Sequence, residues 1–183
     1  DLGYEALFLP EKSDLIAALR EDAKRLFYMQ LTRNNYRVVS AIYQYSEGLN
    51  KDFLFALAEH ESGFYYNSTN ENVDKRTGRV VSTDRGIFQL NSRSYPGLTT
   101  EEFYQIELNV MYGIQHIRGE LAYNKGNARK ALWSYNAGRS RLNAPPEITI
   151  RYANIILART QALRVARETF VQEKLKEYES LLD

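Results

Sequence analysis

Glu61 is the side chain whose surroundings best suit it to acid chemistry. It falls on an apolar helical stripe, four residues after Leu57 and three after Ala58, so the helix should bury its carboxyl. Gly63 predicts the end of that helix, which places Glu61 in the last turn, where the helix dipole is negative. Burial and the dipole both disfavour the carboxylate, so Glu61 should keep its proton near neutral pH, as a general acid must. The pattern alone equally allows an ordinary carboxylate at a frayed helix end.

Four short motifs follow one another through the middle of the chain. They are E-S-G-F at 61–64, G-I-F-Q-L at 86–90, N-V-x-x-G at 109–113 and S-Y-N-A-G at 134–138. In this order and spacing they resemble the catalytic domain of the soluble lytic transglycosylases, within the lysozyme superfamily. The resemblance covers residues 47–158. It implies cleavage of the β-1,4 bond between N-acetylmuramic acid and N-acetylglucosamine in peptidoglycan, with a 1,6-anhydro product and no cofactor.

The resemblance also implies roles for individual side chains. Glu61 would protonate the glycosidic oxygen and then act as base on the muramoyl 6-hydroxyl, while the acetamido group of the substrate stabilises the intermediate. The residues implied for substrate binding are Ser62, Gln89, Tyr135, Asn136 and Tyr152. Spacing alone offers plainer interpretations of two of them: Tyr135 as a core aromatic with a bonded hydroxyl, and Ser62 as the end of its helix.

The last family motif is incomplete in this chain. The family usually has E-T-x-x-Y, and Thr149 and Tyr152 keep that spacing, whereas Ile148 occupies the glutamate position and Glu147 is displaced by one. We therefore expect the Tyr152 hydroxyl to lie in the cleft near Glu61, and no role is carried over to Glu147.

Asp84 is a possible second carboxylate. The segment S-T-D-R-G-I-F-Q at 82–89 resembles the animal lysozymes, in which the aspartate of S-T-D is the second catalytic carboxylate. A hydrolytic muramidase that uses Glu61 and Asp84 is therefore an alternative function. The plainer interpretation of Asp84 is a turn residue that bonds its own backbone. A non-catalytic peptidoglycan-binding or assembly module is a further alternative.

Composition and charge narrow the range of partners. The chain of 183 residues has 24 basic and 23 acidic residues, which gives no electrostatic basis for binding nucleic acid or an anionic membrane. It has no cysteine, so a disulfide framework and a thiolate metal site are excluded. His60 and Glu61 are adjacent on a helix and point in different directions, so we expect no metal site.

The rest of the pattern predicts a mainly α (α+β, lysozyme-like) fold with one small β-hairpin between residues 65 and 85. Helices are expected at 13–31 with Ser13 as the N-cap, at 36–45, and from 50 to Gly63. The capping box T-x-x-E at 99–102 opens a helix that continues to about residue 121, with Glu107 on its apolar face. Further helices are expected at 127–138, with Gly138 as a left-handed stop, and from Pro145 unbroken to residue 182.

We divide the chain into an N-terminal helical extension (1–46), a lysozyme-like transglycosylase domain (47–158) and a C-terminal helical extension (159–183). The apolar stripes at 15–31 and 163–182 should pack against each other, because each needs a partner. Docking of another protein on these terminal helices is the alternative. The resemblance implies peptidoglycan glycan strands as substrate and a periplasmic or cell-envelope location in a bacterium, with any signal peptide or anchor outside this sequence.

Overall fold

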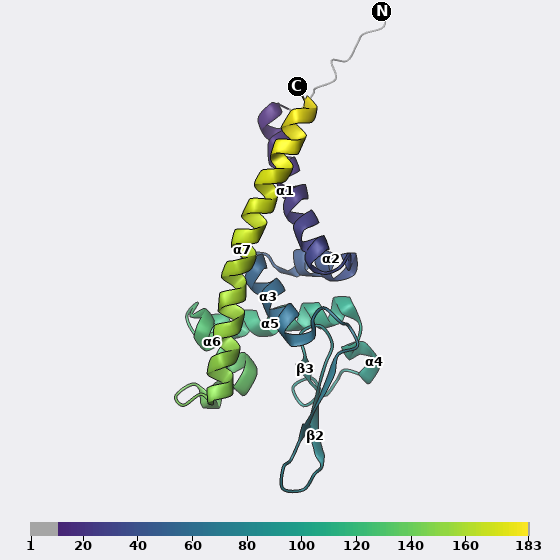
Figure 1. Ribbon diagram of the computed structural model, residues 1–183. Helices are drawn as coiled ribbons and strands as arrows, with labels where there is room; N and C mark the ends of the chain where they lie inside the picture. Colours follow the sequence, from purple (N-terminus) through teal and green to yellow (C-terminus); the bar gives the residue numbers. More distant parts are fainter. Residues whose placement is uncertain (1–10, 183) are drawn as a thin grey trace, which may run out of the picture.

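The computed structural model describes residues 11–182, which form a mainly helical molecule with one small sheet (Figure 1). The helices are α1 (Lys12–Leu31), α2 (Tyr36–Tyr45), α3 (Lys51–Ser62), α4 (Thr100–Phe103), α5 (Ile106–Tyr123), α6 (Ala128–Ala137) and α7 (Glu147–Leu182), with a 3₁₀ turn η1 (Arg139–Arg141) after α6. The strands are β1 (Thr69–Val73), β2 (Val80–Arg85) and β3 (Leu90–Asn91). The predicted hairpin is present, and β3 adds a short third strand that the sequence did not indicate.

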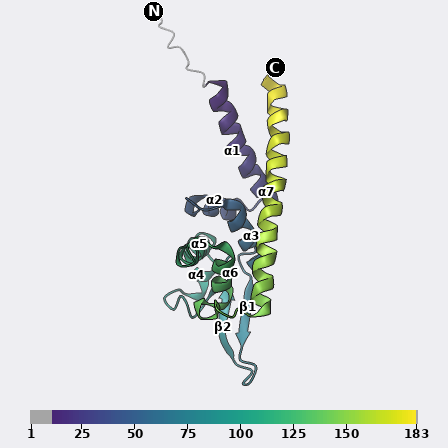
Figure 2. The same cartoon turned by 90° about the vertical axis from the view of Figure 1, so that its left-hand side faces the viewer.

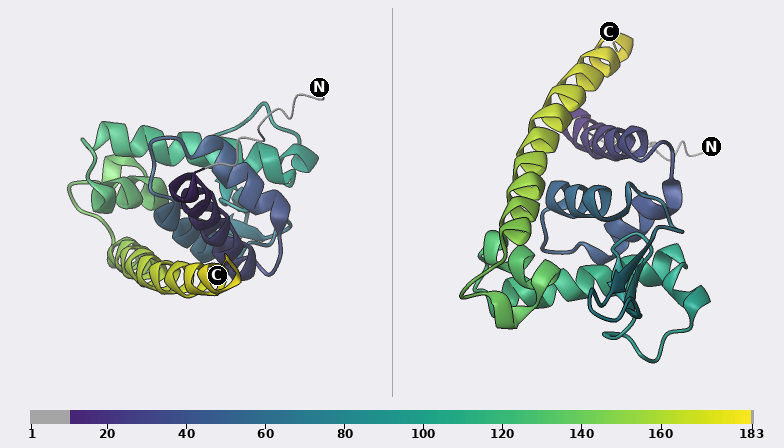
Figure 3. Two further views of the ribbon diagram at one scale, coloured as in Figure 1. Left: turned by 90° about the horizontal axis from the view of Figure 1, so that it is seen from above. Right: turned by 60° about the horizontal axis from the view of Figure 1, so that its bottom comes forward.

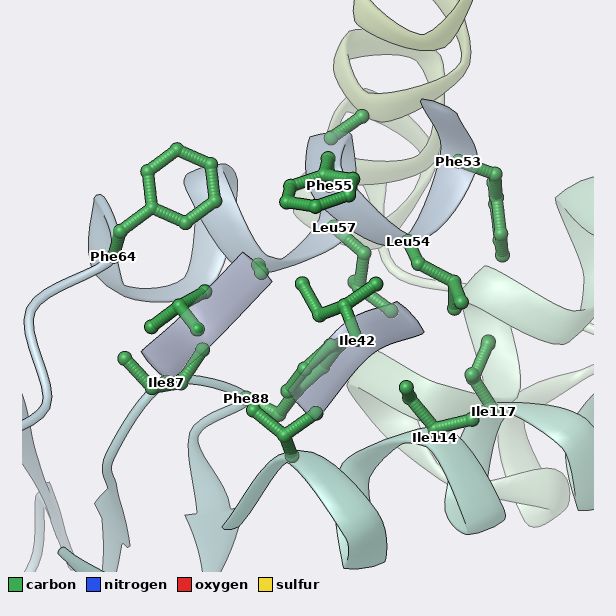
Figure 4. Close-up of a cluster of buried hydrophobic side chains, with 14 of the residues drawn as sticks. Ile42, Phe53, Leu54, Phe55, Leu57, Phe64, Ile87, Phe88, Ile114 and Ile117 are labelled. Carbon is green, nitrogen blue, oxygen red and sulfur yellow. The ribbon is translucent and has the colours of Figure 1, made fainter. Parts of the chain in front are cut away.

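Helix α3 lies at the centre of the main core. Every residue from Phe53 to Ala58 is buried, so this segment is apolar around its whole circumference rather than along one stripe. Its leucines point toward Ile42 of α2 and Ile114 of α5 (Figure 4). Contact on several sides fixes the helix, and with it the position of Glu61 in the last turn.

The three strands form an antiparallel sheet in the order β1-β2-β3. The β1–β2 hairpin projects from the body at the end opposite to the tips of α1 and α7 (Figure 1). Across the sheet, Asn70 pairs with Asp84, and Asp84 pairs with Asn91. Laterally paired residues point to the same face, so one face of the sheet presents a row of polar side chains.

Helices α1 and α7 form an antiparallel pair that extends away from the rest of the molecule (Figures 1 and 2). Ala23 of α1 packs with Val171 and Leu175 of α7 in a second, smaller apolar cluster. The predicted packing of the C-terminal tail on the N-terminal helix is therefore confirmed. Helix α7 runs for 36 residues without a break and lies along one side of the other helices (Figure 3).

A buried polar cluster joins this helix pair to the body. Asp52, in the first turn of α3, accepts a hydrogen bond of 2.6 Å from the Tyr28 hydroxyl of α1. Arg167 of α7 donates to the two oxygens of the same carboxylate, at 3.0 Å from Nε and 2.8 Å from Nη2. Burial raises the pKa of Tyr28, and the neighbouring Asp52 adds to this effect, so the hydroxyl remains a donor. A single carboxylate therefore links α1, α3 and α7.

Three local predictions were wrong. Helix α1 begins at Lys12 with Glu11 as its N-cap, so Ser13 lies inside the first turn. The helix that Thr99 caps ends at Phe103, because the Phe103 carbonyl accepts a hydrogen bond of 2.8 Å from the Asn109 side chain and the helix begins again at residue 106. Glu107 does not face the core or the cleft; it pairs at the surface with Arg37, at 2.9 and 2.7 Å.

One helix end differs from the prediction in its backbone geometry. Gly138 ends α6 with φ 84° and ψ 155°, so it shares only the positive φ with the predicted left-handed stop. The division of the chain at 46/47 and 158/159 stays a prediction; α2 packs into the main core, and α7 passes residue 158 without interruption.

Between residues 11 and 182, no helix combines the length and hydrophobicity needed to cross a bilayer.

Candidate active site

Glu61 lies in the last turn of α3, as predicted, and its carboxyl faces a cleft. The helix ends at Gly63, whose left-handed backbone (φ 60°, ψ 26°) lets its N–H bond the Glu59 carbonyl. The hydroxyl of Tyr152, from α7, donates a hydrogen bond to Oε1 of Glu61. Burial raises the pKa of Glu61 to about 7, although the Tyr152 hydrogen bond acts in the opposite direction; the charge of Asp84 raises the pKa further. Glu61 can therefore hold or release a proton near neutral pH.

The cleft in front of Glu61 has a volume of about 620 Å³. One wall is the polar face of the sheet, and the other is formed by α5, the end of α6 and η1. Amide, hydroxyl and carboxyl groups dominate its lining. Such a lining suits a ligand that is rich in hydroxyl and amide groups, as an amino sugar is.

Asp84 stands on the sheet wall of this cleft. Its two carboxylate oxygens each accept one amide hydrogen bond of 2.8 Å, from Asn72 on one side and Asn91 on the other. Both amides also donate to the hydroxyl of Ser82, at 3.2 and 3.0 Å. Asp84 belongs to β2, so the interpretation as a turn residue is wrong. The sheet instead presents Asp84 as a hydrogen-bonded carboxylate on the same cleft as Glu61.

Gln89 lines the cleft, but its polar atoms are already bonded to the chain. Its Nε2 donates to the carbonyls of Ser68 and Gly86, at 3.1 and 2.9 Å, and its Oε1 accepts from Asn70 at 2.7 Å. Its backbone has a positive φ of 51°, which a non-glycine residue rarely adopts. These bonds tie the turn at residues 86–89 to β1.

Asn109 fixes the same turn from the α5 side. Its Oδ1 accepts from the Phe88 N–H at 2.8 Å, and its Nδ2 donates to the carbonyls of Arg85 and Phe103, at 2.9 and 2.8 Å. The amide lies so close to Gly86 that a Cβ at Gly86 would come within 2.3 Å of it. N-V-x-x-G therefore acts by positioning the G-I-F-Q turn, and the sequence alone did not show this.

Two of the predicted binding residues lie on the α6 wall. The hydroxyl of the partly buried Tyr135 donates to the Phe88 carbonyl at 2.6 Å, as its plainer interpretation predicted, and the residue also lines the cleft; its role in substrate binding stays a prediction. Asn136 also lines the cleft, and its Oδ1 accepts from the Thr149 hydroxyl at 2.7 Å. The two residues of T-x-x-Y thus connect α7 to the α6 wall, through Thr149 and Asn136, and to Glu61, through Tyr152.

Ser62 and Tyr152 do not line the cleft directly. The buried hydroxyl of Ser62 donates to the carbonyls of Ala58 and Ile87, at 3.1 and 2.8 Å. These two bonds join the end of α3 to the G-I-F-Q turn, as the plainer interpretation of Ser62 as a helix end predicts. The hydroxyl does not reach the cleft. Tyr152 is also buried: its hydroxyl bonds Glu61, as expected, but the residue does not lie in the cleft.

Three ionisable residues of the cleft were not predicted. Glu120, which is buried, pairs with Arg139 Nε at 3.1 Å and lies 3.6 Å from His116 Nε2. The ring of His116 is 4.5 Å from that of Tyr135. His116 and Glu120 are spaced i, i+4, and Arg139 directly follows S-Y-N-A-G; both signals also fit ordinary surface residues, so they did not stand out in the sequence.

Comparisons with known proteins give the family and a similar fold. Residues 38–153 match the family described as Transglycosylase SLT domain. The chain is also similar in structure to an inactive glutamate-to-glutamine mutant of the lytic transglycosylase Slt from Pseudomonas aeruginosa. The TM-score is 0.51 at 18% identity, over 70% of this chain and 23% of that one. No curated protein sequence matches the chain. The structural likeness confirms the predicted fold. The family match covers well over half of the chain, and the chain therefore belongs to the Transglycosylase SLT domain family.

Proposed function

We propose that this protein cleaves the β-1,4 bond between N-acetylmuramic acid and N-acetylglucosamine in peptidoglycan and releases a 1,6-anhydro product, with Glu61 as the general acid and base. The observation that carries the proposal is Glu61 itself. It is a carboxyl whose pKa is raised to about 7, held by Tyr152 and facing a polar cleft of about 620 Å³. Family membership supports the same reaction class.

In the first step, protonated Glu61 donates its proton to the glycosidic oxygen as the bond from the anomeric carbon to that oxygen breaks. The acetamido oxygen of the muramoyl residue attacks the anomeric carbon and compensates the developing positive charge. Glu61 is now a carboxylate, and the Tyr152 hydroxyl, which remains protonated because burial raises its pKa, can donate to it.

In the second step, the Glu61 carboxylate removes the proton of the muramoyl 6-hydroxyl. The resulting oxygen attacks the anomeric carbon and displaces the acetamido oxygen, which forms the 1,6-anhydro ring and restores protonated Glu61. Tyr135 and Asn136 form the wall along which the sugars lie. We assign Gln89 and Ser62 to shaping the turn opposite Glu61, because their side chains bond the backbone around it.

Digestion of purified peptidoglycan sacculi tests the proposal. We expect soluble muropeptides that end in 1,6-anhydromuramic acid, identified by mass spectrometry. Reducing ends would instead show hydrolysis, and the absence of any soluble fragment would contradict both reactions. Chemical reduction of the digest before analysis is the control, since it changes the mass of reducing ends and leaves anhydro ends unchanged.

Hydrolysis by a muramidase mechanism is the second candidate, and Asp84 is the observation that favours it. Asp84 lines the same cleft as Glu61, on the sheet wall, and is held there by Asn72 and Asn91. It supplies the second carboxyl group that a two-carboxylate mechanism requires. Transglycosylation needs only one carboxyl group, because the 6-hydroxyl of the substrate replaces water.

The Asp84→Asn variant separates the two candidates. We expect it to release anhydro ends at a rate reduced by less than about tenfold, whereas a muramidase would lose on the order of 10²-fold or more. The charge of Asp84 raises the pKa of Glu61, so the variant should also lose activity at a lower pH than the wild type. Rates of muropeptide release from pH 5 to 9 measure both effects. Loss of all products from Asp84→Asn would favour the muramidase.

The same proposal places the protein in the envelope of a bacterium, where its substrate lies. The paired helices α1 and α7 extend beyond the part of the chain that carries the cleft (Figure 2). We propose that residues 1–46 and 159–183 act as extensions of the transglycosylase domain.

A further inference from the structure

Arg139 is held on two sides within the cleft that contains Glu61. Its Nε donates to Glu120 at 3.1 Å, and the Glu120 side chain is only 8% exposed, whereas that of Arg139 is 48% exposed. The centre of the guanidinium group lies 4.1 Å from the centroid of the Tyr123 ring. The buried carboxylate and the aromatic face therefore fix a charged group at the border between protein and cleft.

The outer edge of this guanidinium group is available to a ligand. Within residues 11–182, Arg139 bonds the protein only through Nε, and its two terminal nitrogens donate to no protein atom. The rest of the cleft lining consists mainly of amides, hydroxyls and carboxyls. Burial lowers the pKa of His116, so this neighbour contributes little positive charge near neutral pH. Of the described residues, Arg139 is thus the fixed positive charge of the cleft.

A planar guanidinium with free terminal nitrogens is suited to a carboxylate, which it can bind through two parallel hydrogen bonds. The sugar rings of peptidoglycan carry no charge. The carboxylates of peptidoglycan lie on the stem peptides or, where the peptide has been removed, on the lactyl group of the muramoyl residue. Resting on the proposed function, we propose that Arg139 is a specificity-determining residue that binds a carboxylate of the peptidoglycan strand.

The test measures binding in the Glu61→Gln background, so that the strand is not cleaved. Three ligands are compared: glycan strands with stem peptides, peptide-free strands with free lactyl carboxylates, and chito-oligosaccharides, which carry no carboxylate. We expect Arg139→Gln to raise the Kd by about tenfold for one or both carboxylate ligands and to leave chito-oligosaccharide binding unchanged. Added salt should raise the Kd for the carboxylate ligands less in the Arg139→Gln variant than in the protein that keeps Arg139.

The ligand that responds identifies the source of the carboxylate, the stem peptide or the lactyl group. Arg141→Gln is the matched control, since Arg141 is exposed in the same short turn and does not line the cleft. Arg139→Gln leaves the buried Glu120 carboxylate without its cation, which could disturb the fold around it. The Glu120→Gln/Arg139→Gln double variant removes the Glu120 charge as well, and the binding measurements are repeated with it.

Two results would overturn the proposal. Unchanged binding of all three ligands would show that Arg139 contacts no carboxylate, and an equal loss for all three would show a merely structural role. Failure of the wild type to cleave sacculi would instead remove the proposed function, and this inference with it.

Discussion

Glu61→Gln should abolish release of muropeptides, with a rate at least about 10³-fold below that of the wild type. Glutamine keeps the size of the side chain and can still bond the Tyr152 hydroxyl, but it carries no proton that it can transfer at neutral pH. The rate is measured as soluble fragments released from purified sacculi at pH 6. A matched control is Glu59→Gln in the same helix, because Glu59 bonds Arg159, at 2.6 and 2.9 Å, and does not line the cleft. Glu59→Gln should retain most of the activity.

The fold of Glu61→Gln should survive, and its stability should depend on pH in a defined direction. The folded protein raises the pKa of Glu61 from 4.5 to about 7, so the native state binds more protons than the unfolded state between these values. The resulting contribution to stability is fully present below pH 4.5 and is lost as pH rises through 7. At pH 8 the variant should therefore be more stable than the wild type, by up to roughly 3 kcal/mol, while the two should be similar at pH 4. Urea unfolding at both pH values tests this. A folded variant that still cleaves sacculi would remove Glu61 from the mechanism, and an unfolded variant would contradict the expected survival of the fold.

Asp52→Ala should lower the free energy of unfolding by about 3–5 kcal/mol. The substitution leaves Arg167, whose side chain is only 18% exposed, without its carboxylate, and it also removes the acceptor of the Tyr28 hydroxyl. Urea unfolding at pH 7, followed by circular dichroism, measures the change as a shift in midpoint at constant slope.

The chain offers a matched control for this buried pair. Glu107 also receives two hydrogen bonds from one arginine, Arg37, but both side chains of that pair are about half exposed, at 49% and 50%. Glu107→Ala should cost less than about 1 kcal/mol, because solvent screens the pair. Equal effects of the two substitutions would show that burial of Asp52 adds nothing to the stability of the α1, α3 and α7 junction.

The parts of the site that could be predicted from sequence are those encoded locally. The apolar run up to Ala58 and the stop at Gly63 place Glu61 in the last turn of a buried helix, and the structure agrees. The contact of Tyr152 with Glu61, in contrast, joins segments 91 residues apart, and it was predicted only through the resemblance of T-x-x-Y to the family motif.

Other parts depend on contacts between distant segments, which periodicity does not report. Asn109 bonds backbone atoms of residues 85, 88 and 103, and no spacing within its own helix indicates those partners. The same bonds interrupt the helix that the capping box at Thr99 opens, although no proline or glycine marks the break. Asp84 gave an ambiguous pattern, because the sheet register that turns it toward the cleft was not specified by the sequence of β2 alone.

The uninterrupted course of α7 has a mechanical consequence. At 36 residues it is a rod about 54 Å long. Near one end the Tyr152 hydroxyl bonds the Glu61 carboxyl, and further along the helix Arg167 is paired with Asp52 of α3. Because one continuous helix carries both residues, a displacement of α7 relative to α3 would change both contacts together. The part of α7 that pairs with α1 is therefore mechanically coupled, through one continuous helix, to the side chain that contacts Glu61.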